Sequence, residues 1–158
     1  GSTDIDTIFI SYTPFYFFRF EIEQGLMDGT IAVADVPSVW ASKMKELLGV
    51  DVPGDAQGCL QDIHWSIGAF GYFPSYTLGA VMACQFFEAA KKAIPDLHLH
   101  LETGNFGPLK DWLNKEVHER GSLYASPDEL LMKVTGEGMQ PKALSDHLRT
   151  KYSQIYGL

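Results

Sequence analysis

Residues that typically start or end helices recur along the chain, and their spacing constrains the fold more than any other feature. Asp35 stands before Pro37, and Ser126 stands before Pro127 and Glu129, which are typical helix starts. With glycine and proline stops between them, these signals predict helices over 11–28, 36–48, 74–94, 105–119, from 126 and over 141–156. A helical turn or two is expected over 58–65. Strand signals are few, so the sequence predicts an all-α fold.

Composition narrows the classes of function. The chain has 158 residues, of which 46% are hydrophobic and 13% aromatic, enough for one compact domain and too apolar for intrinsic disorder. The formal net charge of −8 disfavours nucleic acid as a partner. No apolar stretch reaches the roughly 18 residues of a membrane-spanning helix, and no cationic stretch precedes the apolar run 8–18, so neither a membrane partner nor a secretory signal is expected.

Two cysteines, Cys59 and Cys84, lie in apolar contexts without a CxxC pair. They predict buried thiols in a reducing cytoplasm. Gly1 and Ser2 resemble the remnant of a cleaved affinity tag, so we expect residues 1–10 to be a tag remnant with a lead-in, and 11–158 to be the helical region of a longer protein.

The helix predicted over 11–28 carries the run Phe15-Tyr16-Phe17-Phe18, which is apolar on every side. Such a helix is expected to be buried on most of its surface, and any exposed part would be an interaction site. Arg19 and Glu23 stand four residues apart, so we expect them to pair. On the helix predicted over 74–94, the polar residues Gln85, Glu88 and Lys92 share one face and predict a solvent-facing stripe.

The segment from His98 through His100 to Glu102 is a candidate metal site, because an extended backbone would place both imidazoles and the carboxylate on one face. In a helix these side chains would splay apart. Three ligands without a fourth do not complete a structural zinc site, so a connecting loop with surface histidines is the favoured interpretation. The sequence contains no HExxH, GxSxG, GxGxxG or P-loop motif.

Residues 58–79 concentrate a histidine, two tyrosines, a Gln-Asp pair and several glycines ahead of an apolar helix. Glycines allow a loop to pass close to a substrate or to hinge over it. Tyrosine hydroxyls and a histidine N–H can donate to a developing oxyanion. Alternatively, His64, Trp65, Tyr72 and Tyr76 are core residues that anchor the loop. Composition alone favours this second interpretation.

Ordered motifs resemble the carboxy-terminal third of the Taq-type thermostable metallocarboxypeptidases. They are Gly58-x-x-Gln61-Asp62-x-His64-Trp65, the run 70–79, the segments 19–23 and 34–40, and the tail 143–158. The resemblance extends from about Tyr12 to the end of the chain, whereas 1–10 match poorly. It implies a helical lobe fragment of a two-lobed metallopeptidase with a Gly/Tyr-rich active-site loop. It also implies a cytoplasmic, homodimeric enzyme that releases single residues from peptide C-termini with zinc or cobalt.

In that family the metal is held by an HExxH helix and a later HES glutamate, neither of which this sequence contains. The resemblance therefore implies a groove wall without metal ligands, and an isolated chain without activity. By the same resemblance, His64 and a tyrosine, Tyr76 in preference to Tyr72, donate hydrogen bonds to the substrate carbonyl or its oxyanion. Gln61 and Asp62 orient His64 or contact substrate, and Arg19 is a candidate for holding a substrate carboxylate.

Two other functions remain open from the sequence. The chain could be a non-catalytic helical module that binds peptide termini, or a scaffold whose apolar amino-terminal helix pairs with a partner subunit. Loss of peptide binding in His64→Ala or Tyr76→Phe would favour the module. Loss of an oligomer in Phe17→Asp would favour the scaffold.

Overall fold

The computed structural model describes residues 3–157, with side chains from residue 14 onward, and the expected tag remnant Gly1-Ser2 lies outside the described residues. Within that range every regular element is a helix, which confirms the predicted all-α fold. The chain divides into two compact units at residues 78 and 79. The elements are α1 (Thr3–Asp28), η1 (Val33–Asp35), α2 (Val36–Leu48), η2 (Asp55–Gln57), η3 (Cys59–Gln61), η4 (Trp65–Ile67), α3 (Pro74–Ala93), α4 (Leu97–Glu102), α5 (Gly107–Glu116), η5 (His118–Arg120), α6 (Pro127–Thr135) and α7 (Pro141–Tyr156).

Helix α1 begins at Thr3, eight residues before the predicted start at Ser11. A serine followed closely by Pro14 resembles a helix start, since proline is tolerated in the first turn. In the structure Pro14 lies inside the helix instead. An internal proline sacrifices one backbone hydrogen bond, and the sequence rule therefore placed the boundary too late.

Helix α2 agrees with its prediction at both ends. Pro37 occupies the first turn, where its missing N–H is not needed. Gly49 ends the helix with φ of 68°, in the left-handed region that glycine adopts without strain, and its N–H donates to the carbonyl of Lys45 at 3.0 Å.

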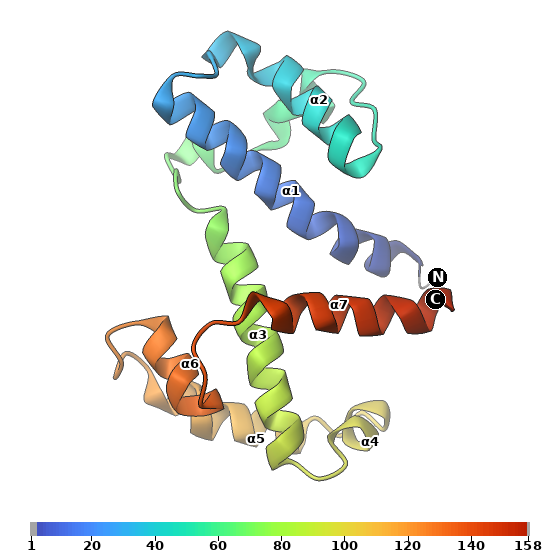
Figure 1. Cartoon of the computed structure of the whole chain (residues 1–158), viewed down its shortest axis with the longest axis vertical. Coiled ribbons are helices and arrows are strands. Elements are labelled where there is room, and N and C mark those ends of the chain that lie inside the picture. The colour runs from blue at the N-terminus through green and yellow to red at the C-terminus, as the bar shows by residue number, and fades with distance from the viewer. Residues whose placement is uncertain (1–2, 158) are drawn as a thin grey trace. The chain divides into compact units, whose positions relative to one another are not determined.

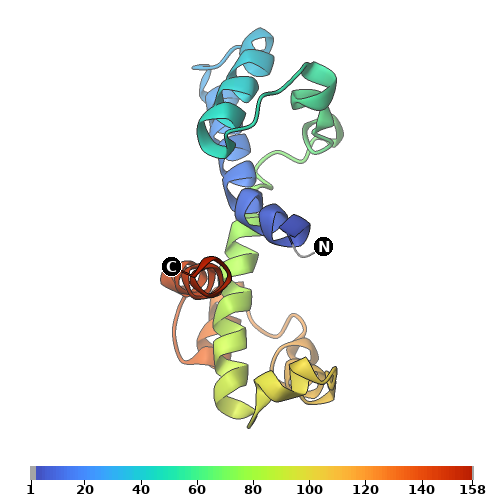
Figure 2. The same cartoon turned by 90° about the vertical axis from the view of Figure 1, so that its right-hand side faces the viewer.

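The core of the first unit forms where α1 and α2 lie side by side (Figures 1 and 2). Phe18, Ile22, Val36 and Trp40 are its buried centre, and the Phe18 ring meets the Trp40 ring edge-on at 5.1 Å. The apolar run on α1 is thus mostly buried, as predicted. Phe17 is the exception at 56% exposure.

Residues 55–67 form three successive 3₁₀ turns, and the second of them, η3, lies inside the range 58–65 where a helical turn or two was predicted. Gly58 explains part of this compact path, because a Cβ there would lie 2.7 Å from Cγ1 of Val52 and 3.2 Å from the carbonyl oxygen of Gly54. Only glycine fits this close approach. The turns end at Gly68, in the left-handed region at φ 74°.

Helices α3 and α7 match their predicted ranges to within a residue, whereas in the second unit the helix predicted over 105–119 is divided into α5 and η5. At the start of α6, Ser126 Oγ accepts from the backbone N–H of Glu129 at 3.3 Å, which confirms the predicted cap.

The expected solvent stripe on α3 is wrong at Gln85. This side chain is buried, donates to the carbonyl of Gly138 and accepts from the N–H of Gln140.

A cleft of about 970 Å³ lies within the second unit, lined by parts of α3, α6 and α7 and by His98 of the 98–102 segment, whereas none of the residues that carry the family resemblance around His64 lines it. None of the described helices is both long and apolar enough to cross a membrane.

Candidate functional site

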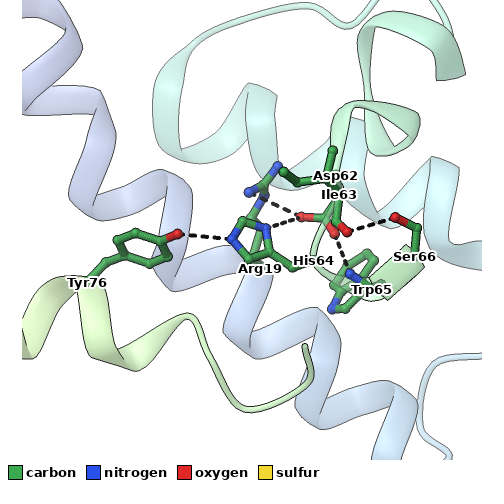
Figure 3. A network of polar contacts seen from close by, with 7 residues as sticks. All are labelled: Arg19, Asp62, Ile63, His64, Trp65, Ser66 and Tyr76. Carbon is green, nitrogen blue, oxygen red and sulfur yellow. Dashed lines mark hydrogen bonds and ion pairs between the residues drawn. The ribbon is translucent and has the colours of Figure 1, made fainter. Parts of the chain in front are cut away.

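Three of the residues predicted to carry chemistry, Arg19, Asp62 and Tyr76, meet around a fourth, His64, in the first unit (Figure 3). Its Nδ1 lies 3.3 Å from Oδ2 of Asp62, and its Nε2 lies 3.0 Å from the hydroxyl of Tyr76 at the start of α3. Both ring nitrogens are therefore engaged, and the side chain is only 14% exposed. The ring orientation is set from both sides.

Asp62 is the link between His64 and α1. Its Oδ2 also lies 3.2 Å from Nη1 of Arg19, and its Oδ1 accepts from the backbone N–H of Trp65 at 2.9 Å. The Arg19 and Asp62 side chains are 5% and 1% exposed. The cation and the N–H donor thus compensate the burial of this carboxylate.

Aromatic rings surround the Arg19 guanidinium. Its Cζ lies 4.2 Å from the ring centroid of Phe15, 5.0 Å from Trp40 and 5.3 Å from Phe73. Cation–π attraction to these rings adds to the ion pair with Asp62. The guanidinium is thus turned into the protein.

The predicted pairing of Arg19 with Glu23 is wrong. The four-residue spacing places both on one side of α1, but Arg19 pairs with Asp62, whereas Glu23 accepts a hydrogen bond from the backbone N–H of Gly71. Tertiary partners on the 58–73 segment replace the local helix pair, because they bury both side chains.

Tyr72 borders the network through its aromatic ring. The ring stacks on His64 at 5.7 Å between centroids, tilted by 29°, and meets Tyr76 edge-on at 5.3 Å. Tyr72 is 50% exposed, so it lies on the solvent side of the network.

Gln61 does not reach His64. It is exposed, and its side-chain amide donates to the carbonyl of Ala56. This contact braces the η2–η3 turns. Of the predicted Gln-Asp pair, only Asp62 orients the imidazole.

The described residues contain no group of three or more His, Cys, Asp and Glu side chains that could hold a metal ion. The segment with His98, His100 and Glu102 is the helix α4, not the expected loop and not an extended strand. His98 packs edge-on against Phe87, and Nδ1 of His100 lies 3.1 Å from the amide nitrogen of Asn105. The two histidines therefore make local contacts.

Cys59 and Cys84 are free thiols, and both are partly exposed rather than fully buried. Partial burial is the main cause that raises the pKa of each, helped by the carboxylate of Asp55 beside Cys59 and of Glu88 beside Cys84. Neither environment activates a thiolate nucleophile.

Two residues that hold the site were not predicted. Tyr16 stacks on Tyr76 at 4.0 Å with 16° between the ring planes, and Glu23 holds Gly71. Both lie on the α1 face that also carries Arg19. The spacing of Tyr16, Arg19 and Glu23 indicates that they share one face of α1. This spacing does not predict which segment of the chain packs against that face.

Comparison with known proteins agrees with this geometry. Residues 5–152 match the family model described as "Carboxypeptidase Taq (M32) metallopeptidase". The matched range begins upstream of Tyr12, where the sequence motifs begin. This match and the all-helical fold identify the chain as part of a helical metallopeptidase. The chain belongs to the M32 family of Taq-type carboxypeptidases.

Curated relatives support this membership. The chain is 38% identical over 147 residues to carboxypeptidase 1 of Bacillus subtilis, covering 93% of this chain and 29% of that protein. It is 36% identical over 148 residues to thermostable carboxypeptidase 1 of Thermus thermophilus, covering 94% of this chain and again 29% of the relative. The chain therefore spans less than a third of the length of these relatives.

Solved structures agree in fold. An M32 carboxypeptidase from Deinococcus radiodurans R1 is 34% identical with a TM-score of 0.86, over 93% of this chain and 30% of that one. Metallocarboxypeptidase 1 of Trypanosoma cruzi is 40% identical with a TM-score of 0.82, over 89% of this chain and 28% of that one.

Proposed function

We propose that residues 11–158 form the carboxy-terminal helical region of a metal-dependent carboxypeptidase, which releases single residues from peptide C-termini. The observation that carries the proposal is the position of His64, held between Asp62 and Tyr76 inside the 58–65 motif. The relatives named as carboxypeptidases support it. Zinc or cobalt as the metal, a homodimer and a cytoplasmic location belong to the same proposal.

The residues of this chain do not fit the metal centre itself, since the described part holds no suitable group of ligands. In our proposal the metal and the general base belong to HExxH and HES motifs that this sequence lacks. The chain supplies the wall of the substrate groove and polar contacts to the scissile carbonyl. The isolated chain is then expected to release no amino acids.

The hydrogen bonds of His64 suggest how the wall would act. When Asp62 accepts a hydrogen bond from Nδ1–H of a neutral His64, the Nε2 atom accepts a hydrogen bond from the Tyr76 hydroxyl. An imidazolium instead donates from Nε2 to the Tyr76 oxygen, and the hydroxyl proton can then turn toward another acceptor. In our proposal the Tyr76 hydroxyl, oriented by His64, donates a hydrogen bond to the substrate carbonyl or its developing oxyanion.

The neighbouring residues take supporting roles in this proposal. Tyr72 borders the substrate side and offers a second hydroxyl. Asp62 sets the His64 tautomer, as carboxylate partners of catalytic imidazoles do. Because its guanidinium is buried against Asp62 and the rings, Arg19 fixes Asp62 instead of holding a substrate carboxylate. Gln61 braces the turns.

The test begins by extending the reading frame upstream of the codon for Thr3. A frame that carries HExxH and HES supports the proposal, and the protein that it encodes is then produced whole. Tyr76→Phe should lower kcat by about 10²–10³, the usual cost of one oxyanion donor, with a smaller change in KM. Tyr156→Phe, at an exposed position on α7, is the matched control and should leave kcat unchanged. A Tyr76→Phe enzyme within twofold of the unmodified enzyme would contradict the assigned role.

A second experiment uses the 158-residue chain. Incubated with a peptide and zinc or cobalt, it should release no C-terminal residue, and release would refute the assignment of metal and base to other segments. Peptide binding without cleavage, lost in His64→Ala or Tyr76→Phe, combined with a frame lacking both motifs, would instead establish the binding module. The relatives, all named as carboxypeptidases, do not favour that alternative.

A further inference from the structure

Helix α1 presents three buried side chains on one face toward the segment that carries the site. Tyr16, Arg19 and Glu23 are spaced by three and four residues, which aligns them along the helix. They are 8%, 4% and 4% exposed. Each contacts a different piece of the site, and the contacts of Tyr16 and Arg19 were described above. Of the three, Glu23 is the side chain whose burial on this face of α1 most needs an explanation.

The contact of Glu23 is with the backbone of the Gly/Tyr-rich loop. Its Oε1 accepts the N–H of Gly71, which lies 48 positions along the chain and directly precedes Tyr72. Gly71 has φ of 75°, a left-handed conformation natural to glycine. The carboxylate thus holds the loop at the residue where the backbone turns toward Tyr72.

Stability alone does not explain a carboxylate at this position. Its second oxygen, Oε2, is buried without a hydrogen-bond partner, and no ion pair of Glu23 occurs within the described part of the chain. A buried, half-satisfied carboxylate costs free energy relative to an apolar side chain of similar size. The hydrogen bond from the Gly71 N–H is therefore the feature that explains a carboxylate at position 23.

We propose that Glu23 is a positioning residue: it latches the loop 68–73 to α1 and thereby sets the Tyr72 ring on His64. The stacking distance of 5.7 Å between these rings is the geometry that the latch maintains. The proposal rests on the proposed function, which assigns Tyr72 and His64 to the substrate side of the groove. It adds a residue that touches neither substrate nor metal.

The test uses NMR on the 158-residue chain with Glu23→Ala and Glu23→Gln. Removing the acceptor in Glu23→Ala should accelerate hydrogen exchange of the Gly71 amide by about tenfold or more, as expected for losing a hydrogen bond to a charged acceptor. The His64 ring-proton resonances should move as Tyr72 leaves the ring. In Glu23→Gln, the amide oxygen should preserve most of the protection and the ring shifts, while the Gly71 amide resonance moves upfield because the acceptor is neutral.

Glu21→Ala is the matched control. Glu21 lies on the same helix and pairs with Lys43 at the surface of α2, away from the loop. Its replacement should leave the Gly71 amide and the His64 ring protons unchanged. An equal response to Glu21→Ala and Glu23→Ala would overturn the latch, because both would then act through helix stability.

Unchanged Gly71 exchange in Glu23→Ala would also overturn it. Should Glu23→Ala fail to fold, the Gly71 resonance in Glu23→Gln decides, and a resonance that stays in place rejects the hydrogen bond. These readouts need neither metal nor peptide. A negative NMR result therefore rejects the role of Glu23 and leaves the proposed function standing. Conversely, a complete enzyme that has no activity while its Gly71 amide stays protected rejects only the proposed function.

Discussion

Neutralising Asp62 tests whether the buried ion pair with Arg19 holds the site together. Asp62→Asn keeps the shape of the side chain and an oxygen that can accept the Trp65 N–H, so the change removes mainly the charge. The Arg19 guanidinium would then be left buried without its carboxylate, because its side chain is only 5% exposed. Breaking a buried pair from one side costs about 3–5 kcal/mol.

The rings around Arg19 offset part of this cost. Cation–π attraction is worth about 0.5–2 kcal/mol, and it continues to compensate the guanidinium in Asp62→Asn because the change does not remove these rings. We therefore expect a loss near the lower end, about 3 kcal/mol. With a urea m-value of roughly 1–3 kcal/mol/M, the unfolding midpoint should fall by roughly 1–3 M.

The assay is urea unfolding followed by far-UV circular dichroism. Asp51→Asn is the matched control, because it breaks the ion pair with Lys45 at a position where the Asp51 side chain is 83% exposed. Exposed pairs contribute at most about 1 kcal/mol. The double variant Arg19→Met with Asp62→Asn removes both charges and should lose less than the sum of the single variants. Equal losses in Asp62→Asn and Asp51→Asn, or additive single losses, would refute the reasoning.

Three further predictions concern the core, a cap and a thiol. Trp40→Ala should cost about 3–5 kcal/mol of unfolding free energy in the same urea assay, because Trp40 is 1% exposed; a loss below about 1 kcal/mol would contradict its place in the core. Ser126→Ala should cost about 1 kcal/mol and lower the midpoint of thermal unfolding, and an unchanged midpoint would show that the hydrogen bond to Glu129 contributes nothing. The raised pKa of Cys84 predicts slow alkylation by iodoacetamide at neutral pH that accelerates in alkaline solution, measured by mass spectrometry, and Glu88→Gln should accelerate it at a given pH. The pKa of Cys84 is higher in the folded chain than in the unfolded chain. The contribution of this thiol to the free energy of unfolding is therefore complete below the unfolded pKa and is lost as pH rises through the folded pKa.

Much of the fold was readable from local chemistry. The Ser126 cap predicted the start of α6, and prolines in the first turn predicted the starts of α2 and α7, because these effects act within one helical turn. Asp35, placed as a cap before α2, makes no side-chain cap hydrogen bond. The start of α1 was misjudged, since Pro14 is tolerated inside a helix whose packing outweighs its local cost. The 98–102 segment was misjudged too, because a helix of 6 residues is too short for hydrophobic period to distinguish it from a loop.

The sequence by itself indicated a candidate site, because the 58–65 motif and the tyrosines that follow it lie close together in the chain and resemble the family's motifs. Only the tertiary structure decided their partners. Arg19 turned from its helical neighbour Glu23 to Asp62, and Glu23 turned to the Gly71 backbone. A helical spacing lets two residues pair at a gain of a few tenths of a kcal/mol. When packing buries both side chains, leaving any charge uncompensated costs several times more, so the long-range partners prevail.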